Sequence, residues 1–196
     1  AAHCRELLTS NTLLLGEGLP HGRAISMKAR VYVDARCLQD HSLRGRGVGS
    51  YVTSLLRTRP SCVSSAFNVI GLIDDTISPL LPEHESLFHE VSTCWNPCLA
   101  EASLFLNGSP MTHSITLSRR FLSHRNTLSV AVVYDFIPLD WPGYLDRTSS
   151  RIEYFSRLAA LKRNDLFTPV SEYTATRLRE LVDAPQQAIR VIGAPV

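Results

Sequence analysis

The sequence predicts an α/β domain whose sheet is mostly parallel and flanked by helices. Short apolar runs of strand length alternate with stretches in which apolar residues recur at helical spacing, which is the pattern of successive β–α units. The run at residues 128–134 is almost wholly apolar, as strands buried on both faces of a parallel sheet usually are.

The first predicted unit is a strand at residues 30–36, a glycine-rich turn, and a helix at residues 48–59. The strand is rich in β-branched and aromatic residues, and the helical spacing of apolar residues ends at Pro60. The turn at residues 45–49 opens the helix. Because a helix start offers free N–H groups and glycine lets a ligand approach the backbone, this unit is a candidate phosphate site.

The later elements follow from the same two periodicities. Further strands are expected at residues 67–73, 87–91, 103–106, 128–134, 165–170 and 188–192, with a loop at residues 80–85. Further helices are expected at residues 5–8, 99–102, 117–122 and 144–162. The last of these is expected to bury Ile152, Phe155, Leu158 and Ala159. Ser171 is a good N-cap for another helix, which should pack through Leu178, Leu181 and Val182.

Composition limits the classes of function. The chain has 196 residues, 44% of them hydrophobic, and a net charge of +2, which suits one globular domain and gives no argument for a nucleic-acid surface. We expect residues 1–27 to be a leader or inter-domain segment and residues 28–196 to be the domain. The five cysteines show neither a disulfide framework nor zinc-ligand spacing, which favours a cytoplasmic protein.

Ligands of open parallel sheets bind outside the carboxyl ends of the strands. This rule selects the loop at 45–49, Asp74–Asp75, residues 107–110, Tyr134–Asp135, Ser171 and Gly193. Arg46 flanks the glycines, and arginine binds phosphate in a fork. No metal-ligand cluster is expected: His84 and His89 lie among glutamates but have no third partner, and we expect them to be solvated or half-buried.

Three stretches together resemble a known family. The first runs from Asp34 through the glycine turn to Tyr51. The second is Tyr134-Asp135-Phe136-Ile137-Pro138-Leu139. The third begins at Asp165 and includes Ser171-Glu172 and, further on, Val191-Ile192-Gly193. In order and spacing, residues 28–196 resemble the N-terminal, acceptor-side domain of retaining family-4 glycosyltransferases of the GT-B fold, especially mannosyltransferase-like members. The resemblance implies a Rossmann-like domain that faces a second, nucleotide-sugar-binding domain expected beyond Val196.

The resemblance also implies roles for particular residues. Gly47, Gly49 and Arg46 would approach the donor diphosphate, and Tyr134 and Asp135 would face the transferred sugar, with Ser171 and Asn107 elsewhere in the cleft. The family often has His-Asp at the corner where this chain has Tyr134-Asp135, and tyrosine donates a hydrogen bond but does not titrate near neutral pH.

The implied reaction transfers a sugar, with mannose as one candidate, from a nucleotide-sugar to a saccharide or lipid-linked acceptor in polysaccharide biosynthesis. The implied partners are these substrates, the donor domain and a membrane surface for peripheral association; no nucleic acid, no metal and no cofactor besides the donor are expected. The chain alone is expected to be inactive.

Two other functions are compatible with the residues. One is an NAD-dependent oxidoreductase domain with Asp74 or Asp75 on the ribose, although Ser50 stands where the fingerprint Gly-x-Gly-x-x-Gly has its third glycine. The other is a non-catalytic module that binds a saccharide or a protein partner.

Overall fold

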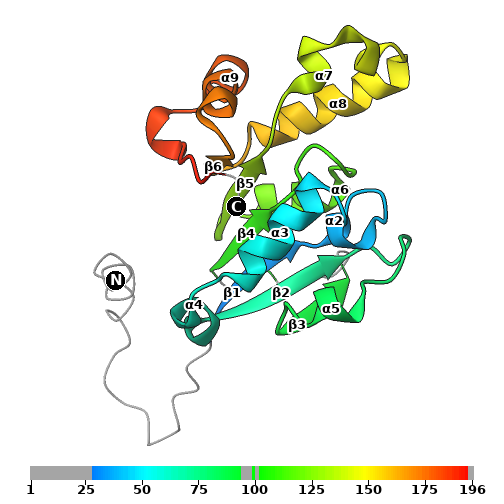
Figure 1. Ribbon diagram of the computed structural model, residues 1–196. Coiled ribbons are helices and arrows are strands. Elements are labelled where there is room, and N and C mark those ends of the chain that lie inside the picture. The colour runs from blue at the N-terminus through cyan, green and yellow to red at the C-terminus, as the bar shows by residue number, and fades with distance from the viewer. Residues whose placement is uncertain (1–27, 94–98, 100–101, 194–196) are drawn as a thin grey trace, which may run out of the picture.

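The computed structural model describes residues 28–93, 99 and 102–193. Its centre is a six-stranded sheet with strand order β3-β2-β1-β4-β5-β6, in which every neighbouring pair is parallel (Figure 1). The strands are β1 (Ala29–Asp34), β2 (Phe67–Ile73), β3 (Glu90–Thr93), β4 (Ser103–Asn107), β5 (Thr127–Val133) and β6 (Leu166–Pro169). The predicted Rossmann-like α/β fold with a parallel sheet is therefore confirmed.

The helices connect these strands. They are α2 (Arg36–Gln39), α3 (Gly47–Arg57), α4 (Ser61–Ala66), α5 (Pro82–Glu85), α6 (Thr116–Leu122), α7 (Ile137–Asp140), α8 (Thr148–Leu161) and α9 (Glu172–Val182), with 3₁₀ turns η1 (Pro142–Leu145) and η2 (Gln186–Ala188). The sequence prediction was correct in kind for α3, α6 and α9. The turns predicted at residues 5–8 and 99–102 include residues outside the described part.

Side chains on opposite faces of the sheet pack against different helices. Val33 and Val69 lie under α3, where they meet Val52 and Leu56. On the other face, the rings of Phe105 and Phe121 stack with centroids 4.4 Å apart, which fixes α6 on the sheet. This division follows from the alternation of side chains along each strand.

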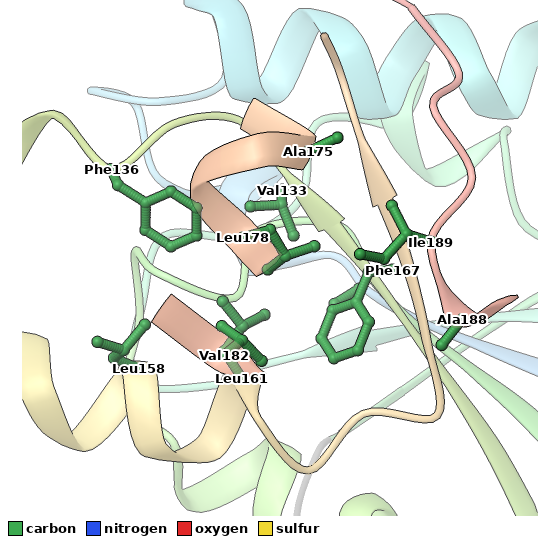
Figure 2. Packing of buried hydrophobic residues seen from close by; sticks show 11 residues of the cluster. Val133, Phe136, Leu158, Leu161, Phe167, Ala175, Leu178, Val182, Ala188 and Ile189 are labelled. Carbon is green, nitrogen blue, oxygen red and sulfur yellow. The ribbon is translucent and has the colours of Figure 1, made fainter. Parts of the chain in front are cut away.

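A second core lies where β5 and β6 meet α8 and α9 (Figure 2). Phe136, Leu158 and Leu178 converge there with Phe167, and Leu178 is fully buried. Ser171 caps α9 as predicted, because its Oγ accepts a hydrogen bond from the Thr174 amide at 3.1 Å. The core holds the corner after β5 against α8, and this corner forms one wall of the candidate site.

Several predicted elements were wrong in extent. The loop predicted at residues 80–85 contains α5, and the strand predicted at residues 87–91 is β3, which begins only at Glu90. The helix predicted at residues 144–162 is broken between η1 and α8. The strand predicted at residues 188–192 is reduced to one bridge between Phe167 and Ile189.

The predicted buried face of the 144–162 helix was correct at Leu158 and wrong at Ile152, Phe155 and Ala159. Ile152 is 64% exposed and Phe155 is 50% exposed, whereas Tyr154, Leu158 and Leu161 are buried. Leu158 lies at helical spacing both from Ile152 and Phe155 and from Tyr154 and Leu161, so spacing alone does not choose between the two faces. The packing against β5 and β6 decides between them.

Candidate functional site

A cavity of about 350 Å³ lies at the carboxyl edge of β4 and β5. Four segments form its walls: the first turn of α3, the loop after β4, the corner after β5, and α8 with η1. Its lining includes Val48, Ser109, Met111, Thr112, Tyr134, Asp135, Tyr144, Glu153, Tyr154 and Arg157. This is the edge of a parallel sheet at which ligands bind.

The first turn of α3 is open to an incoming anion. Arg46 occupies the N-cap position with extended backbone and provides no side-chain cap, so the Gly47 and Val48 amides have no capping acceptor among the described residues. Gly47 is exposed, and a Cβ placed on it would meet no atom within 4 Å. The Arg46 side chain is exposed beside these amides.

Gly49 differs from Gly47 in its surroundings. Its amide donates a hydrogen bond to the Leu43 carbonyl at 3.3 Å, and a Cβ on it would come within 2.4 Å of Arg44 Cα. Gly49 therefore allows the loop to close against the helix, while Gly47 is the glycine that stays accessible to a phosphate.

Tyr134 joins three parts of the site. Its hydroxyl donates a hydrogen bond to the Gly108 carbonyl at 2.9 Å and lies 3.5 Å from the Val48 carbonyl. Its ring meets Tyr51 edge-on, with centroids 5.5 Å apart. Burial raises the pKa of Tyr134 well above its ordinary value, and the nearby Cys37 and Tyr51 side chains raise it further. Tyr134 is therefore a neutral donor that positions the start of α3 against the loop after β4.

Asp135 is the exposed carboxylate of the corner. Its Oδ1 accepts a hydrogen bond from the Ile137 amide at 3.1 Å, and the side chain lines the cavity. Its second oxygen has no hydrogen-bond partner among the described residues and remains available to a ligand.

Among the predicted site residues, Tyr134 and Asp135 line the cavity, whereas Arg46, Gly47, Gly49, Asn107 and Ser171 do not. Asn107 is buried, and its Oδ1 accepts from the Ser109 amide at 3.4 Å, which shapes the turn after β4. Ser171 caps α9. The structure thus brings together Tyr134, Asp135 and the first turn of α3, and it gives Asn107 and Ser171 local structural roles.

Two buried hydroxyls in the cavity lack ordinary hydrogen-bond partners. Tyr154 is 6% exposed and Ser109 is 2% exposed, and neither hydroxyl bonds a nitrogen or oxygen in the described part of the chain. The Ser109 hydroxyl faces the Cys37 thiol, which is a weak partner. An unsatisfied buried hydroxyl is costly, so each would gain from a polar ligand or water, which reaches these oxygens only after a small movement of the surrounding side chains.

The ionisation of Tyr154 is set by its surroundings. Burial raises the pKa of Tyr154 to about 12, and the carboxylates of Asp135 and Asp140 act in the same direction. Near neutral pH the hydroxyl is therefore protonated and can donate a hydrogen bond to a ligand oxygen.

The sequence analysis missed the contribution of α8 to the site. Arg157 pairs with Glu153, one turn earlier, and its Nε donates a hydrogen bond to the His113 carbonyl at 3.0 Å. Two features of the sequence indicate this contribution. Glu153 and Arg157 are spaced i, i+4, and so are Tyr154 and Leu158. These four residues place charge and hydroxyl groups on the cavity wall and apolar groups in the core.

A buried ion pair supports the site from below. Arg36 donates to Asp34 through Nε at 2.9 Å and Nη2 at 2.7 Å, and the two side chains are 4% and 0% exposed. The Arg36 Nη1 group also donates to the Ser114 carbonyl at 2.8 Å. Arg36 and Arg157 thus both donate to backbone carbonyls of the loop between β4 and α6.

His113 lies on this loop and is 11% exposed. Burial lowers the pKa of His113 below its ordinary value, and the guanidiniums of Arg36 and Arg157 lower it further. The carboxylates of Asp34 and Asp40 oppose this shift without cancelling it.

This histidine should make stability depend on pH. Below the ordinary histidine pKa the unfolded chain binds a proton that the folded His113 resists, so the free energy of unfolding should fall as pH drops from 7 toward 5. The slope per histidine is at most about 1.4 kcal/mol per pH unit. Urea titrations at several pH values should show a shallower slope for His113→Gln than for the parent, and equal slopes would contradict this. His84, whose pKa burial also lowers, should account for part of the remaining slope.

No group of three potential metal ligands occurs among the described residues. His84 is buried, contrary to expectation, while His89 is exposed and its Nδ1 accepts from the Val69 amide at 3.0 Å. Burial raises the pKa of Cys37 to about 12, so its thiol is unreactive near neutral pH, and Cys62 is exposed.

In the described ranges, no helix is both long and apolar enough to cross a bilayer. A comparison with models of protein families gave no match to this chain, and none of the curated proteins compared with it matched either.

Proposed function

We propose that this chain is the acceptor-side domain of a retaining glycosyltransferase, which transfers a sugar from a nucleotide-sugar to a saccharide or lipid-linked acceptor. In this role the first turn of α3 receives the donor diphosphate, and the cavity receives sugar hydroxyls. The domain contributes mainly by positioning the substrates and by offering N–H groups to the departing diphosphate.

The observation that supports this most is the cavity itself. It combines two unsatisfied hydroxyls, Ser109 and Tyr154, with the carboxylate of Asp135 and the aromatic side chains of Tyr134 and Tyr144. Buried hydroxyls, a carboxylate and aromatic rings together suit a polyhydroxylated ligand, because they offer both donors and acceptors beside apolar ring surface. Val48, at the start of α3, borders the same cavity.

The oxidoreductase alternative has less support from the geometry. β1 ends at Asp34, and the whole of α2 separates it from the glycine turn, whereas a dinucleotide fingerprint follows its strand directly. The Asp74 carboxylate is also engaged locally, since it accepts hydrogen bonds from the Thr76 amide at 2.9 Å and hydroxyl at 2.6 Å.

Binding of nucleotide-sugars tests the proposal directly. Ligand-observed NMR on the 196-residue chain should show binding of GDP-mannose or a UDP-sugar in preference to NADH. Gly47→Val should weaken this binding several-fold, because its side chain would stand over the amides that face the diphosphate.

Gly45→Val is the matched control, since a Cβ at Gly45 also meets nothing within 4 Å. It should fold equally well and bind like the parent. Equal binding by the parent and Gly47→Val would remove the phosphate role. Preference for NADH over the nucleotide-sugars would overturn the proposed function.

A further inference from the structure

One face of the sheet is only partly covered by helices. Ala131 and Val133 of β5 point toward α8 and α9, so the alternate residues Val130 and Val132 face the side of α3. On that side α3 packs over β1, β2 and Leu106 of β4, whereas Val130 of β5 and Thr168 of β6 lie outside this cluster and line an open groove. Leu128, on the same face, is 46% exposed.

The uncovered region forms an almost wholly apolar groove of about 400 Å³. Its walls include Leu55, Leu104, Leu106, Val130, Thr168 and Ile192. Parallel sheets are normally covered on both faces, because their strands are apolar on both sides. A groove of this kind therefore requires an apolar occupant.

We propose that the occupant is the segment before β1, seated through the leucines of residues 7–15. This stretch contains five leucines, and no charged residue lies between Glu6 and Glu17, which matches the apolar groove. The segment joins β1 at Ala29, and Val31 of the same strand lines the groove. The segment before β1 therefore joins the fold next to the apolar groove.

The length of the segment is sufficient. Thirteen residues lie between Leu15 and Ala29, and the extended chain from one to the other reaches roughly 45–50 Å. Three strands of a sheet span only about 10–15 Å. A second copy of the chain is the competing occupant, and it differs in that it would join two molecules.

A photo-crosslinker at the edge of the groove distinguishes these occupants, and Leu128 suits it because it pairs with Leu104 of the groove lining. Benzoylphenylalanine in place of Leu128 should crosslink to residues 7–15 within one molecule, as seen by mass spectrometry of the full chain. The same probe in place of Tyr173, which is 66% exposed on α9, is the control and should give no such product. A crosslink between two molecules, or the absence of any crosslink at Leu128, would overturn the proposal.

Removal of the segment provides a second test. A chain that begins at Met27 should bind the apolar dye ANS with several-fold higher fluorescence than the full chain at an unchanged far-UV spectrum. The full-length variant with Leu13, Leu14 and Leu15 replaced by serine should behave in the same way, which guards against an effect of truncation on folding. Unchanged dye fluorescence in both variants would contradict the proposed packing.

Discussion

Replacing Arg36 with methionine is expected to lower the free energy of unfolding by about 3–5 kcal/mol. Asp34 is fully buried, and its carboxylate receives two charge-assisted hydrogen bonds from the Arg36 guanidinium. Methionine keeps much of the apolar stem but removes both donors, so an ionised carboxylate would remain in the interior without its partner. Urea denaturation at pH 7 measures the loss.

The double variant Asp34→Asn/Arg36→Met separates the orphaned charge from the other losses. It removes both charges, so it should recover most of the stability lost in Arg36→Met alone. If the double variant were as unstable as the single one, the stability would come from packing or from the Arg36–Ser114 hydrogen bond. The ion pair would then not explain the effect.

Gly49→Ala should produce the second large loss, of about 1–3 kcal/mol or more. The added Cβ would lie 2.4 Å from Arg44 Cα and 2.6 Å from the Arg44 and Leu43 carbonyl oxygens. These are backbone atoms and cannot move by changing a rotamer, so the loop must separate from the first turn of α3. Thermal and urea denaturation of the variant would both report this loss.

The same turn contains two matched controls. A Cβ at Gly45 or Gly47 meets nothing within 4 Å, and neither residue has a positive φ. Gly45→Ala and Gly47→Ala should therefore be neutral or stabilising by up to about 1 kcal/mol, through the unfolded state or helix propensity. Equal losses at all three positions would show that the turn resists any side chain and that close contact at Gly49 is not the cause.

The central strands could be predicted because their apolar runs are both continuous and bounded. β2 has the predicted limits, and β5 is shifted by one residue. β3 was placed too early because Leu87 and Phe88 are apolar but belong to the turn before the strand. Phe88 packs against Gly71, where a Cβ would come within 2.9 Å of its ring. Such packing from a turn has no periodic signature.

The site could be predicted only in the parts that follow strand ends. The carboxyl-edge rule selected the Tyr134–Asp135 corner and the glycine turn, which the structure places beside one cavity. It could not select Tyr154 and Arg157, because they lie in the middle of a helix and reach the cavity only through the packing of α8. The buried pair Asp34–Arg36 was missed for a related reason: charged residues after a strand usually indicate a solvated loop.

Tyr51 connects the site to the point where the described chain leaves the fold. Its hydroxyl donates to the Gly193 carbonyl at 3.1 Å, and Gly193 has a φ of 68°. Together with the edge-on contact to Tyr134, this makes a continuous series from the Gly108 carbonyl through two phenol rings to Gly193. A displacement of α3 on ligand binding would therefore either break the Tyr51–Gly193 hydrogen bond or move Gly193 together with the helix.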